Sequence, residues 1–88
     1  SVPVECSHGI RYTVPMQILS SASGAITFTA RPSKERASGR ICVEADGEEI
    51  YSKRELGIRP ACMLRFTLNT AQSDKLRSAC RICVSVRE

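Results

Sequence analysis

Residues that usually carry enzyme chemistry are scarce in this 88-residue sequence. It has one histidine and no tryptophan, and its only aromatic side chains are two Tyr and two Phe. A Ser-His-Asp triad is hard to assemble from a single histidine, and the sequence has no P-loop, GxGxxG or paired-carboxylate arrangement. Four aromatic residues do not make the stacking platform that is typical of single-strand nucleic-acid binding. These absences argue against most catalytic classes and against a nucleic-acid partner.

Long apolar runs and clustered charge are also missing. No apolar run of about 18 residues occurs, so we expect no membrane-spanning segment, and the chain opens without the basic and apolar regions of a signal peptide. The net charge of +4 permits an acidic partner. Lys and Arg are scattered along the chain, however, whereas nucleic-acid-binding domains gather them on one face.

Length and first residues indicate a module. A chain of 88 residues makes one domain, 1–88, whose modest core buries about 60% of the unfolded surface. The sequence begins Ser-Val-Pro without Met, which we interpret as a processed chain, a trimmed chain or a piece of something longer.

The five cysteines make an odd number, whereas secreted disulfide frameworks favour an even one. Free cysteine behaves as a small buried apolar residue in reducing compartments. We therefore expect reduced thiols and a cytoplasmic location.

Alternation of apolar and polar residues with a period of two predicts β-strands. It occurs at 10–14, 26–31, 41–46, 62–68 and 80–87, and in the first segment Ile10, Tyr12 and Val14 are expected to share one face. Asp46-Gly47 between two such runs predicts a tight hairpin, whose return strand fades at 52–54. Pro15 should end or bend the first strand, with a short edge strand at 16–19.

The segments between these strands read as loops at 20–24 and 31–39, and as a loop or a single helical turn at 69–75. Six to seven short strands at this spacing, with no long helical pattern, are typical of a sandwich or small barrel. We expect an all-β fold, a small antiparallel β-sandwich of the immunoglobulin or fibronectin kind.

Two short motifs contain candidate redox or ligand residues. Cys80 and Cys83 form a C-x-x-C, but on a strand they point to opposite faces, with Cys80 inward and Cys83 outward, and no second C-x-x-C exists. Cys6 and His8 flank Ser7 before the 10–14 strand, where a thiol and an imidazole resemble a nucleophile with its base or two metal ligands. The competing interpretations are structural thiols and a turn marked by Gly9.

A basic segment, Arg31 to Arg36 followed by Arg40, could accept a phosphate. The alternative is a solvated loop of mixed charge, which we favour because Glu35 interrupts the cations.

Three stretches together resemble a known family. They are Cys6-Ser7-His8-Gly9-Ile10-Arg11-Tyr12-Thr13-Val14-Pro15, then Ile41 to Ile50, then Arg59-Pro60-Ala61-Cys62-Met63. Their order is similar to the C-terminal β-domain of bacterial FAD-dependent, pyridine-nucleotide-disulfide-type oxidoreductases. The third stretch departs from the family pattern, which has a Pro-Gly-Glu-Met-like sequence there.

The resemblance implies an accessory domain that packs on the remainder of a flavoprotein or on another subunit. FAD and NAD(P) would bind Rossmann-like domains of the parent enzyme, so no catalytic, cofactor-binding or metal residue is expected here. The alternative function is a small metal-binding or electron-transfer domain that uses Cys6, His8, Cys80 and Cys83.

Overall fold

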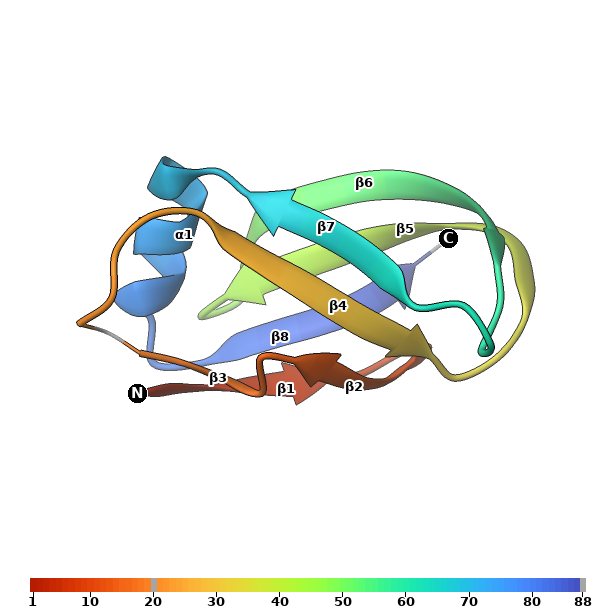
Figure 1. Ribbon diagram of the computed structural model, residues 1–88, viewed down its shortest axis with the longest axis horizontal. Coiled ribbons are helices and arrows are strands. Elements are labelled where there is room, and N and C mark those ends of the chain that lie inside the picture. The colour runs from red at the N-terminus through yellow and green to blue at the C-terminus, as the bar shows by residue number, and fades with distance from the viewer. Residues whose placement is uncertain (20, 88) are drawn as a thin grey trace.

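The computed structural model describes residues 1–19 and 21–87, which form eight strands and one helix in two sheets (Figure 1). The larger sheet has the strand order β3-β1-β8-β5-β6, and the smaller has the order β2-β4-β7. The elements are β1 (Val2–Cys6), β2 (Ile10–Val14), β3 (Gln17–Ile18), β4 (Ile26–Pro32), β5 (Arg36–Ala45), β6 (Glu48–Ile58), β7 (Leu64–Leu68), α1 (Thr70–Arg77) and β8 (Ile82–Arg87). The prediction of a small all-β sandwich is confirmed.

Six of the eight strands follow the connectivity of the immunoglobulin type, with one substitution. Such sandwiches place strands A, B and E in one sheet and C, F and G in the other. Here β2, β4 and β7 occupy the positions of A, B and E, while β5 and β8 occupy those of C and F. The position of G is taken by β1, which pairs in parallel with β8. A strand from the start of the chain therefore lies beside β8, with β3 at the edge beyond it. Because β1 is parallel to β8, no tight hairpin could have joined the two strands.

Three stacked rings join the two sheets in the core. The ring centroids of Phe28 on β4 and Phe66 on β7 lie 5.5 Å apart, and Tyr51 on β6 lies 5.3 Å from Phe66. Aliphatic side chains from the inward registers of β5 to β8 surround them, and burial of each stabilises the fold by about 1.5–3 kcal/mol. These buried residues include Ile41, Val43, Ile58, Leu68, Ile82, Val84 and Val86.

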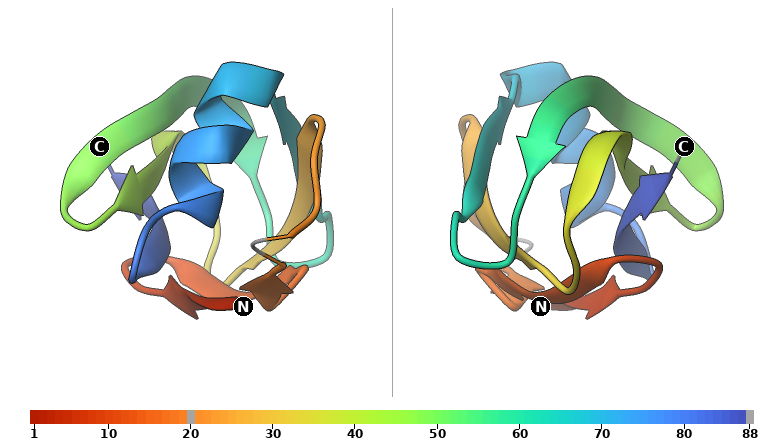
Figure 2. Two further views of the ribbon diagram at one scale, coloured as in Figure 1. Left: turned by 90° about the vertical axis from the view of Figure 1, so that its left-hand side faces the viewer. Right: turned by 90° about the vertical axis from the view of Figure 1, so that its right-hand side faces the viewer.

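The helix α1 closes one end of the sandwich, as the end-on views in Figure 2 show. A capping box fixes its start, because the Asn69 side chain accepts from the Gln72 backbone at 2.8 Å and the Gln72 side chain accepts from the Asn69 backbone at 3.0 Å. Leu76 fills the end of the core. The buried Arg77 guanidinium donates to the Gly24 carbonyl at 2.6 Å and so ties the loop before β4 to the helix. Among the described residues this eight-residue helix is too short to cross a membrane.

The predicted Asp46-Gly47 hairpin is confirmed. Both residues have positive φ, 53° and 87°, and Ala45 pairs with Glu48 across the turn. The return strand does not fade at 52–54, however, but continues as β6 to Ile58. The polar residues 52–54 favour the end of a strand, but β6 pairs with β5 along almost its whole length, and this pairing keeps the segment extended.

Other predicted boundaries were also wrong. The expected loop at 31–39 is mostly strand, since β4 ends at Pro32 and β5 begins at Arg36. The segment 69–75, expected as a loop or a single helical turn, lies in a helix of eight residues that begins at Thr70. The first strand, Val2–Cys6, was not predicted, and Cys62 precedes β7. Residues 21–24 carry no helix or strand, in agreement with the expected loop, whose residue 20 lies outside the described part.

A β-bulge in β2 overturns the predicted register of the 10–14 strand. Ile10 pairs with Pro32 and Tyr12 pairs with Arg31, so one residue of β2 is extra at this point. Because side chains alternate with a period of two, one extra residue reverses the face of every later residue. Ile10 is therefore buried, whereas Val14 points outward and Thr13 points inward.

Candidate functional site

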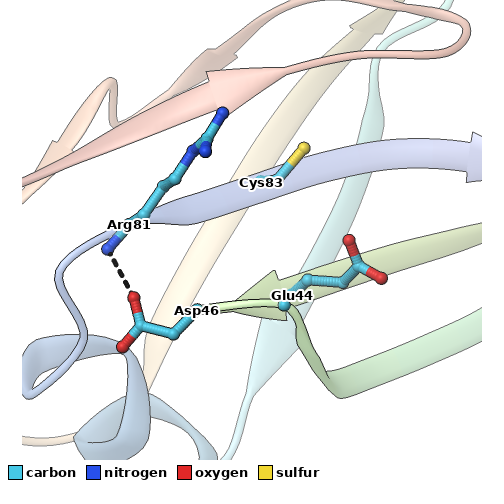
Figure 3. Close-up of a pocket in the computed structure, with 5 residues that line it drawn as sticks. Glu44, Asp46, Arg81 and Cys83 are labelled. Atoms are coloured by element: carbon cyan, nitrogen blue, oxygen red, sulfur yellow. Dashed lines mark hydrogen bonds between the residues drawn. The ribbon is translucent and has the colours of Figure 1, made fainter.

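One candidate site is a hollow among polar groups on the outer face of the larger sheet, where β5 ends and β8 begins. The hollow has a volume of about 490 Å³ and is lined by Glu44, Asp46, Gly47, Arg81 and Cys83 (Figure 3). Glu44 near the end of β5 and Asp46 in the hairpin turn supply its carboxylates, while Arg81 just before β8 supplies the guanidinium and Cys83 on β8 supplies the thiol.

The Asp46 carboxylate accepts hydrogen bonds from backbone amides in the segment just before β8. One oxygen accepts from the amides of Cys80 and Arg81, at 3.0 Å each, and the second lies 3.2 Å from the Cys80 amide. The Asp46 amide in turn donates to the Arg81 carbonyl at 2.9 Å. Asp46 therefore fastens the hairpin to the start of β8, and its oxygens are occupied.

The Arg81 guanidinium is also paired, in this case with the carboxylate of Glu5. Its Nε and Nη2 atoms donate to the two Glu5 carboxylate oxygens at 2.9 and 3.0 Å, which is the two-pronged geometry that suits guanidinium and carboxylate. The hydrogen bond to Glu5 and the attraction of its charge raise the pKa of Arg81. The pair is exposed, and it links β1 to the segment before β8.

Cys83 lies in the centre of this face, and a hydroxyl connects it to the histidine. Its Sγ is 3.3 Å from Ser7 Oγ, and Ser7 Oγ is 3.2 Å from His8 Nδ1. A cysteine nucleophile needs its base within hydrogen-bond reach of the thiol itself. Here the imidazole reaches only the serine, so the three residues form a hydrogen-bonded chain and not a nucleophile–base pair.

Cys6 lies next to Ser7 in the sequence but faces the other way. It is half-buried and packs against the core. Burial raises the pKa of the Cys6 thiol, the nearby Cys83 acts in the same direction, and a hydrogen bond with Thr13 acts in the opposite one. Cys42, which is buried on β5, also has a raised pKa, because of burial first and of a hydrogen bond with Glu49 second. Neither thiol has the lowered pKa that marks reactive cysteines.

The four predicted candidates do not converge on one point. Only Cys83 and His8 are connected, through Ser7. The prediction that Cys80 points inward was wrong, because β8 begins at Ile82 and Cys80 is exposed in the preceding turn. Within residues 1–19 and 21–87, no group of three or more His, Cys, Asp or Glu side chains is placed to hold a metal ion.

Several residues of this face were missed by sequence reasoning. Ser7, Glu5 and Arg81 looked like ordinary polar residues, and Asp46 was assigned only to a turn. No local signal distinguishes them, since their partners lie 34 to 76 positions away in the chain. Only the parallel pairing of β1 with β8 brings the two ends of the sequence together.

A second candidate surface is apolar and is formed by β2, after its bulge, and by the chain that follows β2. Val14, Met16 and Leu19 are 57%, 72% and 59% exposed, and Tyr12 beside them is also exposed. The Thr13 hydroxyl donates to the Pro15 carbonyl at 3.0 Å and holds the turn between β2 and β3. We call Tyr12, Val14, Met16 and Leu19 the apolar segment.

No protein-family model, no curated protein and no solved structure matches this chain.

Proposed function

We propose that this chain is a non-catalytic interaction domain of a larger FAD- and NAD(P)-dependent oxidoreductase. The observation that carries the interaction role is the β-bulge, which turns Tyr12 and Val14 away from the core in the same stretch of chain that exposes Met16 and Leu19. The proposed partner is the remainder of the flavoprotein or another subunit of it.

Exposed apolar side chains at this density need a physical reason. Full burial of a large apolar side chain stabilises a protein by about 1.5–3 kcal/mol, and this stabilisation is absent where the side chain stays in water. Bulges of this kind are features that re-aim side chains, and contiguous exposed apolar groups mark interaction sites. A partner surface that covers the apolar segment would recover the lost burial.

The oxidoreductase assignment is supported by the resemblance of the sequence. Its most specific stretch, Cys6 to Pro15, contains the bulge and the first two members of the apolar segment. The domain would then pack against the flavoprotein body, while FAD and NAD(P) bind elsewhere in the parent enzyme.

The test uses the complete protein that contains this chain. Purified, it should carry FAD and oxidise NAD(P)H, whereas the 88-residue chain alone should do neither. Met16→Asp should detach the domain from its partner, measured as faster cleavage by a protease at the domain boundary. Leu56→Asp is the matched control, because Leu56 is 77% exposed and lies on the other sheet.

The outcomes separate the two parts of the proposal. A complete protein without flavin would contradict the oxidoreductase assignment. Equal protease sensitivity of the Met16→Asp and Leu56→Asp proteins would contradict the apolar segment as the interface.

A further inference from the structure

Three arginines occupy neighbouring positions on the outer face of the larger sheet. Arg40 on β5 pairs in register with Arg54 on β6 and with Arg87 on β8, and all three are exposed. Adjacent strands lie about 4.8 Å apart, so the row extends over roughly 10 Å. We call Arg54, Arg40 and Arg87 the arginine row.

The arginine row is poorly neutralised. Like charges directly opposite one another on a sheet are destabilising. Arg40 has only a loose contact with Glu49, at 3.9 Å between two side chains that are about half exposed, 48% and 47%. Such exposed pairs contribute little. Arg87 Nε donates to the Ser85 hydroxyl at 3.1 Å, and within the described residues the Arg54 guanidinium has no ion pair or hydrogen bond.

Two hollows border the arginine row, and the same two cations line both. One has a volume of about 620 Å³ and includes Lys34, Arg36 and Arg54 in its lining. The other has a volume of about 310 Å³ and includes Lys34, Arg36, Arg87 and His8. The turn between β4 and β5 thus adds positive charge beside the row, although Glu35 also lines the larger hollow.

The backbone beneath the arginine row is closely packed. A Cβ atom added at Gly39 would lie 2.8 Å from Cγ1 of Val86 and 3.0 Å from Cδ1 of Ile58, both buried. These contacts come from β8 and β6, the same strands that carry Arg87 and Arg54. The absence of a side chain at Gly39 therefore lets the three strands fit together directly behind Arg40, and it fixes the spacing of the row.

We propose that the arginine row binds a small phosphate-bearing ligand. The guanidinium group presents a planar fork of donors that matches phosphate oxygens, and several adjacent forks can share one phosphate or diphosphate. Binding would relieve the repulsion within the row. This site is separate from the apolar segment and goes beyond the proposed interaction role.

A small ligand fits the row better than a nucleic acid does. Single-strand binding sites cover about 4–16 nucleotides and stack bases on aromatic side chains. The row is too short for this, and neither tyrosine serves it. Tyr12 lies on the smaller sheet, and Tyr51 is stacked in the core.

The experiment is a titration of the isotope-labelled chain with sodium pyrophosphate, followed by amide chemical shifts at constant ionic strength. Saturable shifts are expected in the strand segments that carry the arginine row. Arg40→Gln should weaken binding about tenfold or more, and Arg40→Lys should weaken it less, because the charge is kept and the fork is lost. Arg65→Gln is the control, since this exposed arginine on β7 pairs in register with Thr29 on the smaller sheet.

Three outcomes would overturn the proposal. They are the absence of saturable shifts, an equal weakening by Arg65→Gln, and binding of an oligonucleotide at the row where pyrophosphate does not bind. Spectra of the free variants verify folding. Arg54→Gln provides a second test at the edge strand if the Arg40 variants do not fold.

Discussion

The outer faces of the two sheets differ in how their charges are sorted. On the larger sheet, cross-strand register aligns Glu5, Cys83 and Glu44 in one row and the arginine row in another, with uncharged Cys42 and Ser85 between them. The smaller sheet presents mainly threonine and arginine, and its exposed apolar residues gather at the edge strand β2. The larger sheet thus presents its charges in ordered rows, whereas the smaller sheet presents threonine and arginine with exposed apolar residues at one edge, although both cover the same core.

The comparison teaches that register decides the character of each surface. The three arginines of the row are separated by 14 and 33 positions along the chain and become neighbours only through pairing. The four residues of the apolar segment lie within eight positions of the chain, and two of them, Tyr12 and Val14, face outward because a bulge reverses the strand.

Loss of the shared core should abolish both faces together. Phe66→Ala removes the ring that contacts Phe28 of the smaller sheet and Tyr51 of the larger one, and it should lower the free energy of unfolding by about 3–5 kcal/mol. Urea denaturation measures this change. Thr67→Ala is the matched control on the same strand, where only an exposed hydrogen bond to Thr27 is lost, with an expected cost of about 0.2–1 kcal/mol. A similar cost for both variants would contradict the account of the core.

Loss of the Asp46 carboxylate should damage only the larger sheet. Asp46→Ala leaves the amides of Cys80 and Arg81 without their acceptor, so we expect a cost of about 1–3 kcal/mol and faster hydrogen exchange at the start of β8. Glu48→Ala at the other side of the same turn is the control, since it lies exposed on β6. Exchange that accelerates equally in the smaller sheet would show that the effect is not local.

A smaller loss of stability should appear at alkaline pH, and it should come from a thiol of the larger sheet, Cys42. Because the pKa of Cys42 is raised in the folded state above its ordinary value of 9.0, the folded chain holds this proton more tightly than the unfolded chain does. Stability should therefore be full below pH 9.0 and decline as the pH rises through the folded-state pKa. Thermal midpoints across this range measure the decline.

One variant separates the contribution of Cys42 from that of Cys6. Cys42→Ala should reduce the slope of stability against pH, and the remaining slope should come from Cys6, whose pKa is also raised. An unchanged slope in the Cys42→Ala chain would contradict the prediction.

Much of the fold could be predicted because it depends on local pattern. The alternation around Phe28, Val43 and Phe66 indicated strands that bury one face, and Asp46-Gly47 indicated a turn that needs positive φ. The helix α1 was underestimated, because its capping box at Asn69 and Gln72 is a local signal that was not used. The candidate site was predicted only in part, since Cys83 and His8 were named but Ser7, which connects them, was not.

The sequence by itself determined a sandwich of short strands and the Asp46-Gly47 hairpin, because alternation and turn chemistry act over a few residues. Tertiary structure alone decided that β1 lies beside β8 in the larger sheet, that Tyr12 and Val14 face outward, and that Arg54, Arg40 and Arg87 form a row. Strand pairing sets these features, and a shift of one residue in register reverses which face a side chain occupies.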